Sequence, residues 1–406
     1  MKNNTVQKNI PRGWIETTLE RECDVLRGQG LSKNKLSENG KNSCILYGEL
    51  FTTYREVIKK IKSRTDSTEG IISKLGDILI PASTTTIAKD LGIASALNEK
   101  DVLLGGDINI LRKKRNSYDS NFLSYYLTHY KNKELSGFAQ GITIIHLYGK
   151  DFKQLDICIP KDIEEQQKIA EILGSVDEDI LKIQEVIDKA EKLKKGLMQK
   201  IFTRGLEDGI KEIKLEDVSK VTSSKRIMRS EYVENGIPFY RSKEIIEKSK
   251  GIKHNSIFYI SNERFKEIKE RFGVPHIGDI LITAVGTIGV VYLVDEEGFY
   301  FKDGNLLWIK DIDKSLNKMY LKHYMKSEIF QKRVLDTAIG SNQKALTIEK
   351  VEKVLIPVPK LKDQQKIAEI LSAIDEKISI NKKLKSKLIR LKKGLAQDLL
   401  SGKVRV

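Results

Sequence analysis

The sequence has few of the residues that most often carry catalytic or metal chemistry. Its 406 residues include three cysteines, five histidines, two tryptophans and seven prolines. Cys23, Cys44 and Cys158 are scattered, no Cys-x-x-Cys pair occurs, and no two histidines have metal-ligand spacing. We therefore expect free, buried thiols in a reducing cytoplasm and no bound metal.

Signatures of nucleotide binding and methyl transfer are also missing. No two prolines are adjacent, which excludes the Asn/Asp-Pro-Pro-aromatic segment typical of adenine methyltransferases. No Gly-Lys-Ser or Gly-Lys-Thr occurs, which excludes a P-loop. No window approaches the roughly 18 apolar residues of a membrane span, and residues 1–12 are too polar for a signal peptide. We expect a cytoplasmic protein that is not itself an enzyme.

Positive charge is in clear excess. Lys and Arg number 72 against 56 Asp and Glu, which gives a net charge of +16 and a pI near 9.4. The excess is clustered at residues 112–115, 225–229 and 382–393. A strongly basic surface predicts an anionic partner. The alternative is a generic basic protein whose charges are simply solvated.

The strongest pattern is a tandem repeat. The segment QQKIAEIL at residues 166–173 returns unchanged at 364–371, and LKKGL at 193–197 returns at the same offset at 391–395. Such long identities at one fixed offset indicate an internal duplication of the chain.

Each copy of the repeat predicts a long helix with a coiled-coil seam. Apolar residues recur in alternating steps of four and three, which is the heptad pattern. Two equal helices with matching seams can pair with each other, and we expect them to run antiparallel. The predicted seam residues are Ile169, Leu173, Val176, Ile180, Ile183 and Ile187 in the first copy and Ile367, Leu371, Ile374, Ile378, Leu388 and Leu395 in the second.

The helices, predicted at residues 161–204 and 360–402, separate two globular regions at 11–160 and 211–359. Each region mixes short strands with one or two helices, which indicates an α/β (α+β) fold. Landmarks return in the same order: GDILI at 76–80 corresponds to GDILI at 278–282, and the strand predicted at 44–47 corresponds to 237–240. The prediction is two mixed domains, two long antiparallel helices and pseudo-two-fold symmetry.

The helical copies are nearly identical, whereas the globular regions differ. We infer that both helices meet the same kind of partner and that the two regions recognise different ligands. For a basic protein, two recognition domains held at a fixed spacing suit two half-sites on duplex DNA.

These features resemble the specificity subunit of type I restriction-modification systems. The resemblance rests on the duplicated QQKIAEIL segment after a proline-ending strand, LKKGL, GSNQK at 340–344 and LSGKVRV at 400–406. It covers about residues 11–406. It implies that 11–160 and 211–359 are target recognition domains, each reading half of a bipartite, asymmetric DNA site. It also implies that two methyltransferase subunits dock for adenine methylation and that motor-nuclease subunits join for restriction. S-adenosylmethionine and ATP then belong to those partners, and this chain binds no cofactor.

DNA contacts are predicted in basic clusters and on polar loops. Phosphates attract Lys and Arg, and base edges are read by Arg, Lys, Asn, Gln, Ser, Thr or His on loops. For each candidate the alternative is a solvated charge or a turn residue. The phosphate candidates are Lys113, Lys114, Arg115, Lys225, Arg226 and Arg229, and the base-reading candidates are Thr143, His146, Arg241, Ser242, Lys243, Asn342, Gln343 and Lys344.

Two other functions remain open from the sequence. One is a stand-alone, bivalent architectural DNA-binding protein without methylase partners, and the other is a self-contained methyltransferase or nuclease. Capture of partner proteins from the native cell distinguishes the first, and an activity assay of the purified chain distinguishes the second.

Overall fold

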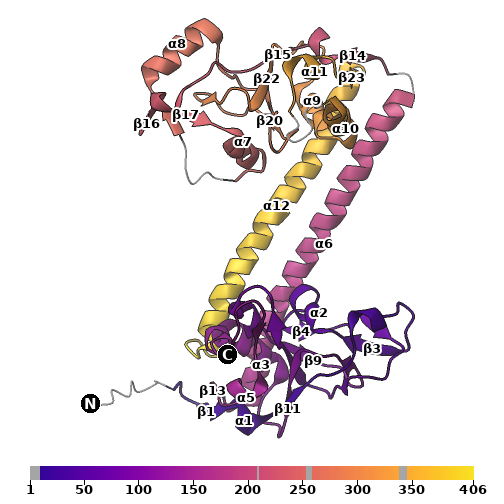
Figure 1. Cartoon of the computed structure of the whole chain (residues 1–406), viewed down its shortest axis with the longest axis vertical. Helices are drawn as coiled ribbons and strands as arrows, with labels where there is room; N and C mark the ends of the chain where they lie inside the picture. Colours follow the sequence, from indigo (N-terminus) through magenta and orange to yellow (C-terminus); the bar gives the residue numbers. More distant parts are fainter. Residues whose placement is uncertain (1–9, 208–209, 253–257, 338–344) are drawn as a thin grey trace. The chain divides into compact units, whose positions relative to one another are not determined.

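The computed structural model describes residues 10–207, 210–252, 258–337 and 345–406. The chain divides into two compact units: unit 1 is Met1–Gln184 with Lys383–Val406, and unit 2 is Glu185–Lys382. Both divisions fall inside long helices, α6 (Ile163–Glu207) and α12 (Leu361–Leu400), which are drawn in Figure 1. Each unit therefore contains part of each long helix.

The strands of unit 1 form one five-stranded sheet, one four-stranded sheet and two strand pairs. They are β1 (Trp14–Thr18), β2 (Cys23–Arg27), β3 (Asn42–Ile45), β4 (Val57–Ile58), β5 (Ser63–Thr65), β6 (Ile71–Ile72), β7 (Asp77–Pro81), β8 (Ser83–Thr84), β9 (Ser95–Leu97), β10 (Leu103–Leu104), β11 (Ile108–Lys113), β12 (Ile145–His146) and β13 (Asp156–Pro160). The sheet orders are β2-β11-β7-β9-β4 and β5-β3-β10-β6. Every residue of β7 is buried because Ile78 and Ile80 pack into one core cluster and Leu79 into another, so both faces are covered.

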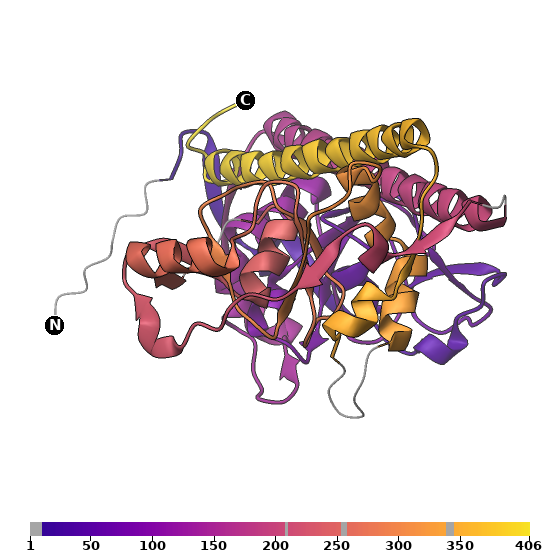
Figure 2. The ribbon, with the colours of Figure 1, turned by 90° about the horizontal axis from the view of Figure 1, so that it is seen from above.

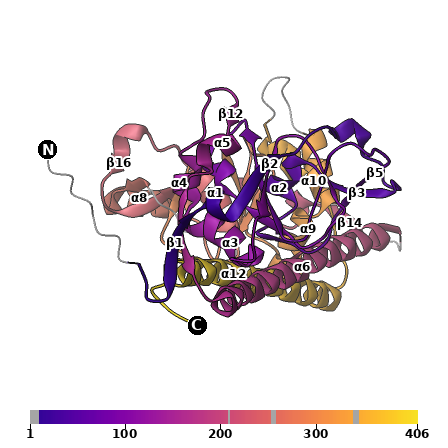
Figure 3. The ribbon, with the colours of Figure 1, turned by 90° about the horizontal axis from the view of Figure 1, so that it is seen from below.

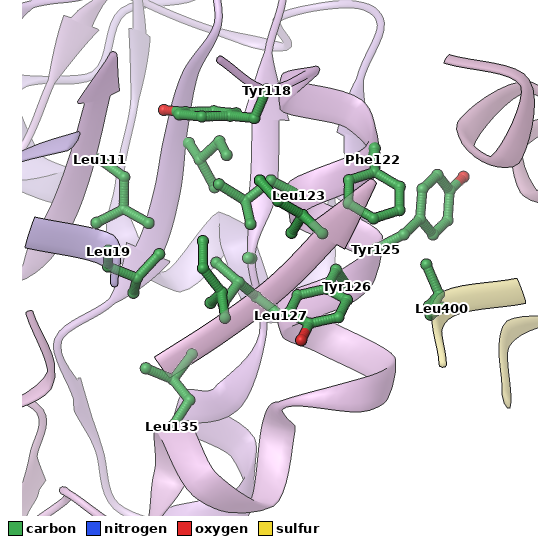
Figure 4. Close-up of a cluster of buried hydrophobic side chains, with 14 of the residues drawn as sticks. Leu19, Leu111, Tyr118, Phe122, Leu123, Tyr125, Tyr126, Leu127, Leu135 and Leu400 are labelled. Carbon is green, nitrogen blue, oxygen red and sulfur yellow. The ribbon is translucent and has the colours of Figure 1, made fainter. Parts of the chain in front are cut away.

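Short helices complete unit 1. They are α1 (Leu19–Glu22), α2 (Tyr47–Thr52), α3 (Ser120–Tyr125), which continues into a π-helical turn (Tyr126–Tyr130), α4 (Asn132–Ser136) and α5 (Gly149–Phe152). The predicted strand at 44–47 is wrong at its end, because Tyr47 begins α2, whose first turn is closed by a Glu49 carboxylate that accepts from the Leu46 amide at 2.8 Å. The aromatic rings of α3 form the core shown in Figure 4, and Leu400 of α12 belongs to the same cluster.

Unit 2 is built from two four-stranded sheets and one strand pair. Its strands are β14 (Glu212–Lys214), β15 (Lys220–Thr222), β16 (Tyr232–Val233), β17 (Ile237–Tyr240), β18 (Phe258–Ile260), β19 (Ile280–Thr283), β20 (Val291–Leu293), β21 (Tyr300–Phe301), β22 (Leu306–Lys310) and β23 (Leu355–Pro357), and its helices are α7 (Ser242–Ser249), α8 (Asn262–Phe272), α9 (Lys318–Met325), α10 (Glu328–Thr337) and α11 (Ile348–Glu352). The sheet orders are β15-β22-β19-β20 and β16-β18-β17-β21. As in β7, alternate residues of β19 pack into different clusters.

The two units share a common arrangement of strands. An antiparallel pair leads into each long helix, β1 with β13 before α6 and β14 with β23 before α12. The antiparallel pair β7–β11 corresponds to β19–β22, and the parallel pair β3–β10 corresponds to β17–β21. The predicted α/β (α+β) fold with two long helices and two globular regions is thus confirmed.

The long helices run antiparallel within each unit. In unit 1, Lys392 of α12 lies 2.8 Å from Asp177 of α6, and the later residue Arg405 pairs with the earlier Glu165. In unit 2, Lys382 lies 2.6 Å from Glu191, and Lys194 lies 2.6 Å from Asp375. Every predicted seam residue is buried or half-buried. Ile169, Leu173, Ile180, Ile187, Leu371 and Ile378 are buried, whereas Val176, Ile183, Ile367, Ile374, Leu388 and Leu395 are half-buried.

A buried glutamine anchors the start of each helix. In unit 1, Gln166 donates to the Pro160 carbonyl at 2.7 Å and accepts from the Asp119 amide at 2.8 Å. In unit 2, Gln364 donates to the Pro359 carbonyl at 2.8 Å and accepts from the Asn317 amide at 2.7 Å. Both glutamines are 0% exposed. Part of the identity between the repeats therefore has a structural cause, since a buried amide must keep all its partners.

No helix in the described part of the chain is long and apolar enough to span a membrane.

Candidate nucleic-acid interface

A basic cavity opens on unit 2. It has a volume of about 620 Å³ and is lined by Arg226, Ile227, Met228, Arg229, Tyr232, Arg241, Phe258, Lys302, Asp303, Gly304 and Asn305. Four cationic side chains against one carboxylate make it positive, and two aromatic rings supply flat apolar walls. These are the groups that bind phosphates and stack on bases. We refer to this site as the basic cavity.

The ends of two parallel strands create the basic cavity. β17 and β21 pair in parallel, so the residues that follow them, Arg241 and Lys302, emerge at the same sheet edge. The Lys302 amide donates to the Tyr240 carbonyl at 2.8 Å and fixes this arrangement. The chain then turns through Gly304, whose φ of +71° favours glycine, and brings Asn305 to the cavity.

The arginines of the basic cavity differ in how they are held. Arg226 pairs with Asp303 at 2.8 Å. Arg241 pairs with Glu244 at 2.8 Å and lies 4.3 Å from the centre of the Phe258 ring. These contacts orient both guanidinium groups and leave part of each exposed.

Two cations remain for a ligand. Among the residues that the structure describes, neither Arg229 nor Lys302 has an ion-pair partner, and both line the basic cavity. Arg229 is exposed and Lys302 half-buried. Lys302 and Asn305 were not among the predicted site residues, because nothing in the sequence indicates that β21 pairs with β17.

The other candidates of unit 2 have separate roles. Lys225 lies 5.1 Å from the Phe272 ring, and its amide donates to the Tyr300 hydroxyl at 2.6 Å. The Ser242 hydroxyl donates to the Asn305 carbonyl at 3.3 Å, which supports the turn, and Lys243 is exposed on α7. The candidates Asn342, Gln343 and Lys344 lie outside the described residues.

In unit 1, the cluster at 113–115 ends strand β11 and is held locally. Lys113 lies 4.9 Å from the Tyr118 ring, and burial lowers its pKa. Lys114 donates to the Glu20 carbonyl at 2.7 Å, and Arg115 pairs with the fully buried Glu22 at 2.7 Å. The structure thus gives all three a part in holding the end of β11, and their contact with DNA stays a prediction.

Glu22 explains why a cation is needed at this strand end. Burial alone raises its pKa, but hydrogen bonds from Arg115, Ser117 and Thr17 outweigh burial and lower it to about 2. A buried carboxylate that stays ionised must be compensated in this way.

The remaining candidates of unit 1, Thr143 and His146, lie on one hairpin loop. Thr143 is exposed, and the His146 ring stacks on Tyr148 with centroids 5.7 Å apart. Arg27 and Lys150 approach the same Tyr148 ring at 5.7 and 5.8 Å. The exposed polar residue Thr143 thus lies on a loop whose base contacts the Tyr148 ring, which the two cations also approach.

A lysine joins the two long helices at the same repeat position in each unit. In unit 1, Lys392 lies 2.8 Å from Asp177 and 2.9 Å from Glu56, and the Tyr125 hydroxyl donates to Asp177 at 2.7 Å. All three charged side chains are about one-tenth exposed, at 11%, 10% and 9% for Lys392, Asp177 and Glu56. This ionic cluster is buried and closes the helix pair of unit 1.

In unit 2 the corresponding residues are Lys194, Asp375 and His323. Lys194 lies 2.6 Å from Asp375, whose side chain is 38% exposed. His323 is fully buried and shares a hydrogen bond with the Ser372 hydroxyl at 3.0 Å. Burial and then the charge of Lys194 lower the pKa of His323 to about 4. Unit 2 thus contains a neutral histidine where unit 1 has Tyr125.

We expect His323 to make unit 2 sensitive to acid. Its folded pKa of about 4 lies below the ordinary value of 6.5, so the unfolded chain binds the proton first. Stability should fall as pH drops from about 6.5 towards 4, by an amount on the order of 3 kcal/mol. Urea unfolding followed by Trp308 fluorescence in a Trp14→Phe background measures this. The double variant His323→Tyr/Ser372→Gly, which copies Tyr125 and Gly174 of unit 1, should remove the dependence; an unchanged pH profile contradicts the assignment.

Each unit also has a groove beside its helix pair. The groove volumes are about 540 Å³ in unit 2 and about 880 Å³ in unit 1. The same repeat positions line both: Lys194, Lys195, Gln199, Asp375 and Ile378 in unit 2, and Lys392, Lys393, Gln397, Asp177 and Ile180 in unit 1. We refer to these as the helix grooves.

No group of histidine, cysteine and acidic side chains in the described ranges is arranged to hold a metal ion. Cys23, Cys44 and Cys158 form no disulfide, and burial raises the pKa of the Cys23 and Cys44 thiols to about 11. These two thiols stay protonated and are poor nucleophiles at neutral pH.

The duplicated helices, the repeated strand arrangement and the basic cavity define a tandem protein with a positively charged cavity on unit 2. The chain belongs to the family of type I restriction modification DNA specificity domains. The family model matches twice, at residues 11–192 and 207–390, which is once for each copy of the internal repeat. The match confirms the resemblance inferred from the sequence and supports sequence-specific DNA recognition.

Individual relatives agree with the family. The chain is 27% identical over 328 residues to the type I restriction enzyme MjaVIII specificity subunit of Methanocaldococcus jannaschii, covering 76% of this chain and 75% of the relative. It is 26% identical over 305 residues to the MjaIX specificity subunit of the same organism, covering 70% and 68%. The fold is similar to the crystal structure of a type I restriction-modification S subunit from M. genitalium, with a TM-score of 0.65 and 19% identity over 98% of both chains. It is also similar to a chain from a structure on complex assembly of the type I R-M system, with a TM-score of 0.55 and 16% identity over 96% and 98%.

Proposed function

We propose that this chain is the specificity subunit of a type I restriction-modification complex, in which unit 1 and unit 2 each read one half of a bipartite, asymmetric DNA site. One observation carries the proposal. The units share the hydrogen bonds of Gln166 and Gln364 at the start of the long helices. Their strand ends differ, because Arg241 and Lys302 follow the parallel pair β17–β21, whereas Leu46 and Gly105 follow the corresponding pair β3–β10. Different surfaces are what two different half-site sequences require, because base edges carry the sequence information.

Two methyltransferase subunits dock on this chain, one at each helix groove. The support is that the same repeat positions line both grooves, so one partner surface fits each of them. Adenine methylation takes place on these partners, which extrude the target base into their own pockets, and motor-nuclease subunits join for restriction. S-adenosylmethionine and ATP are bound by the partners, and this chain contributes no catalytic residue.

The basic cavity provides the test of DNA binding by unit 2. Replacing both Arg229 and Lys302 by alanine should lower the affinity for duplex DNA, because it removes two cations that have no ion-pair partner among the described residues. If both contact phosphates, the slope of log affinity against log salt concentration should fall by about 1 for each contact. Fluorescence anisotropy of a labelled duplex across a salt series measures both quantities.

The matched control is Lys220→Ala, which removes an exposed cation of the same unit outside the basic cavity. It should change neither quantity appreciably. An unchanged affinity and slope in the Arg229→Ala/Lys302→Ala variant would show that the basic cavity does not contact DNA.

A pull-down from the native cell tests the docking proposal. Methyltransferase subunits should be captured by the full chain, and charge reversal at Lys195 and Lys393, which are exposed at equivalent positions of the two helix grooves, should reduce capture. DNA binding with no captured methyltransferase favours the architectural protein instead.

A further inference from the structure

One loop of unit 1 exposes an apolar side chain almost completely. Ile142 is 98% exposed, and Ile144 two residues later is 49% exposed. Both lie between Gln140 and His146, on the loop that precedes β12, and we call residues 140–146 the hairpin loop. Figures 2 and 3 show the β12 segment projecting from unit 1 on the side away from the long helices. With 98% of its surface exposed, Ile142 packs against almost nothing in its own unit and is available to a partner.

The hairpin loop is held rigidly at its base. Gln140 and His146 exchange two backbone hydrogen bonds of 2.7 and 2.8 Å, and β12 pairs with β8. Gly141 has a φ of +127°, and a Cβ at that position would lie 2.1 Å from the Ile144 carbonyl oxygen. Only glycine permits this tight turn. Ile142 is therefore presented by a defined backbone.

The base of the hairpin loop carries aromatic, cationic and acidic groups. His146 stacks on Tyr148, and the cations Arg27 and Lys150 lie on that ring at 5.7 and 5.8 Å. Arg27 also pairs with Asp107 at 2.7 Å, which positions it, while Lys150 is exposed. Two carboxylates share this base, because Asp107 pairs with Arg27 and Asp151 accepts from the Gln140 side-chain amide at 3.3 Å. Lys150 is then the cation that has no ion-pair partner among the described residues. An apolar tip beside such a cation fits a side chain that enters stacked bases while a flanking phosphate is contacted.

We propose that Ile142 is a wedge that enters a base-pair step of duplex DNA at the half-site bound by unit 1. The proposal rests on the proposed function and adds a residue that acts on DNA structure as well as on affinity. A methyltransferase must extrude its target base from the duplex, which costs unstacking free energy. A wedge that has already unstacked the neighbouring base-pair step lowers that free-energy cost. A protein ligand is less suited, because the polar Thr143 separates Ile142 from Ile144 and interrupts the apolar surface at the tip.

The test uses the full chain without partner subunits, so that any unstacking comes from this protein. The duplex carries the site identified by methylation sequencing of host DNA, with 2-aminopurine placed at successive positions in both halves. Binding of the unaltered protein should raise 2-aminopurine fluorescence at one step, in one half only. Ile142→Ala should abolish the rise at saturating protein and lower affinity about tenfold, because an apolar side chain is no longer buried.

Two control variants separate a wedge from a folding effect. Ile142→Leu keeps an aliphatic wedge and should preserve the fluorescence rise. Ile72→Ala removes another exposed isoleucine of unit 1, 59% exposed on β6, and should change nothing.

The experiment distinguishes failure of the wedge proposal from failure of the proposed function. If the unaltered protein does not bind the duplex, the proposed function is wrong. If it binds, and Ile142→Ala binds equally well with the same fluorescence, the wedge is refuted and the hairpin loop faces something other than DNA.

Discussion

Inserting four residues after Ile180 in α6 and four after Leu388 in α12 should move methylation in the host to sites with a longer gap between the two half-sites. Both helices run from unit 1 into unit 2. The insertion points lie at the same level of the antiparallel pair, because the contacts of Lys392 with Asp177 and of Lys385 with Gln184 bracket them. Four helical residues add about 6 Å, and a base pair rises about 3.4 Å. The gap should grow by one or two base pairs while both half-site sequences stay the same.

Single-molecule sequencing of methylated host DNA measures the gap and both half-sites at once. Insertion in α6 alone is the informative control, because the contacts of Lys392 with Asp177 and of Lys194 with Asp375 cannot then be kept together. That variant should lose methylation. An unchanged gap after the paired insertion would show that the helices do not set the spacing.

The long helices could be predicted from the sequence because the heptad pattern depends on residues close together in the chain and occurs twice. A heptad pattern needs only neighbouring residues, and two copies at one offset remove the ambiguity of either alone. The duplication also indicated a common strand order through GDILI at 76–80 and 278–282, which forms the fully buried strands β7 and β19. What the repeat did not reveal is that Gln166 and Gln364 are identical for a structural reason.

The candidate site was harder to predict because it depends on pairing between distant segments. Lys302 reaches Arg241 only because β21 lies parallel to β17, and no short-range pattern encodes that pairing. The basic run at 113–115 looked like a phosphate-binding patch. The structure gives it acidic and carbonyl partners in α1, and a charge run does not reveal whether a buried carboxylate such as Glu22 lies beside it.

The helix pair itself contains the stability effect that we expect to be largest. Replacing Lys392 by methionine keeps the length of the side chain but leaves two buried carboxylates, Glu56 and Asp177, without their common cation. Removing one partner of a buried ion pair typically costs about 3–5 kcal/mol. Urea unfolding followed by Trp14 fluorescence in a Trp308→Phe background reports on unit 1. Lys194→Met is the matched control at the same repeat position, and its loss should be about 1 kcal/mol or less because Asp375 is 38% exposed.

The pH dependence of the Lys392→Met effect identifies its cause. Burial raises the pKa of Glu56, but the hydrogen bond with His129 and the charge of Lys392 overcome it and lower the pKa to about 2. A carboxylate with a depressed folded pKa stabilises the fold above its ordinary value of 4.5, and this contribution is lost as pH falls towards 2. Without Lys392 the folded pKa of Glu56 should rise towards 4.5, so the difference between the two proteins should be greatest near neutral pH and shrink below pH 4.5. A difference that stays constant across this range would mean that packing of the lysine stem, rather than its charge, stabilises unit 1.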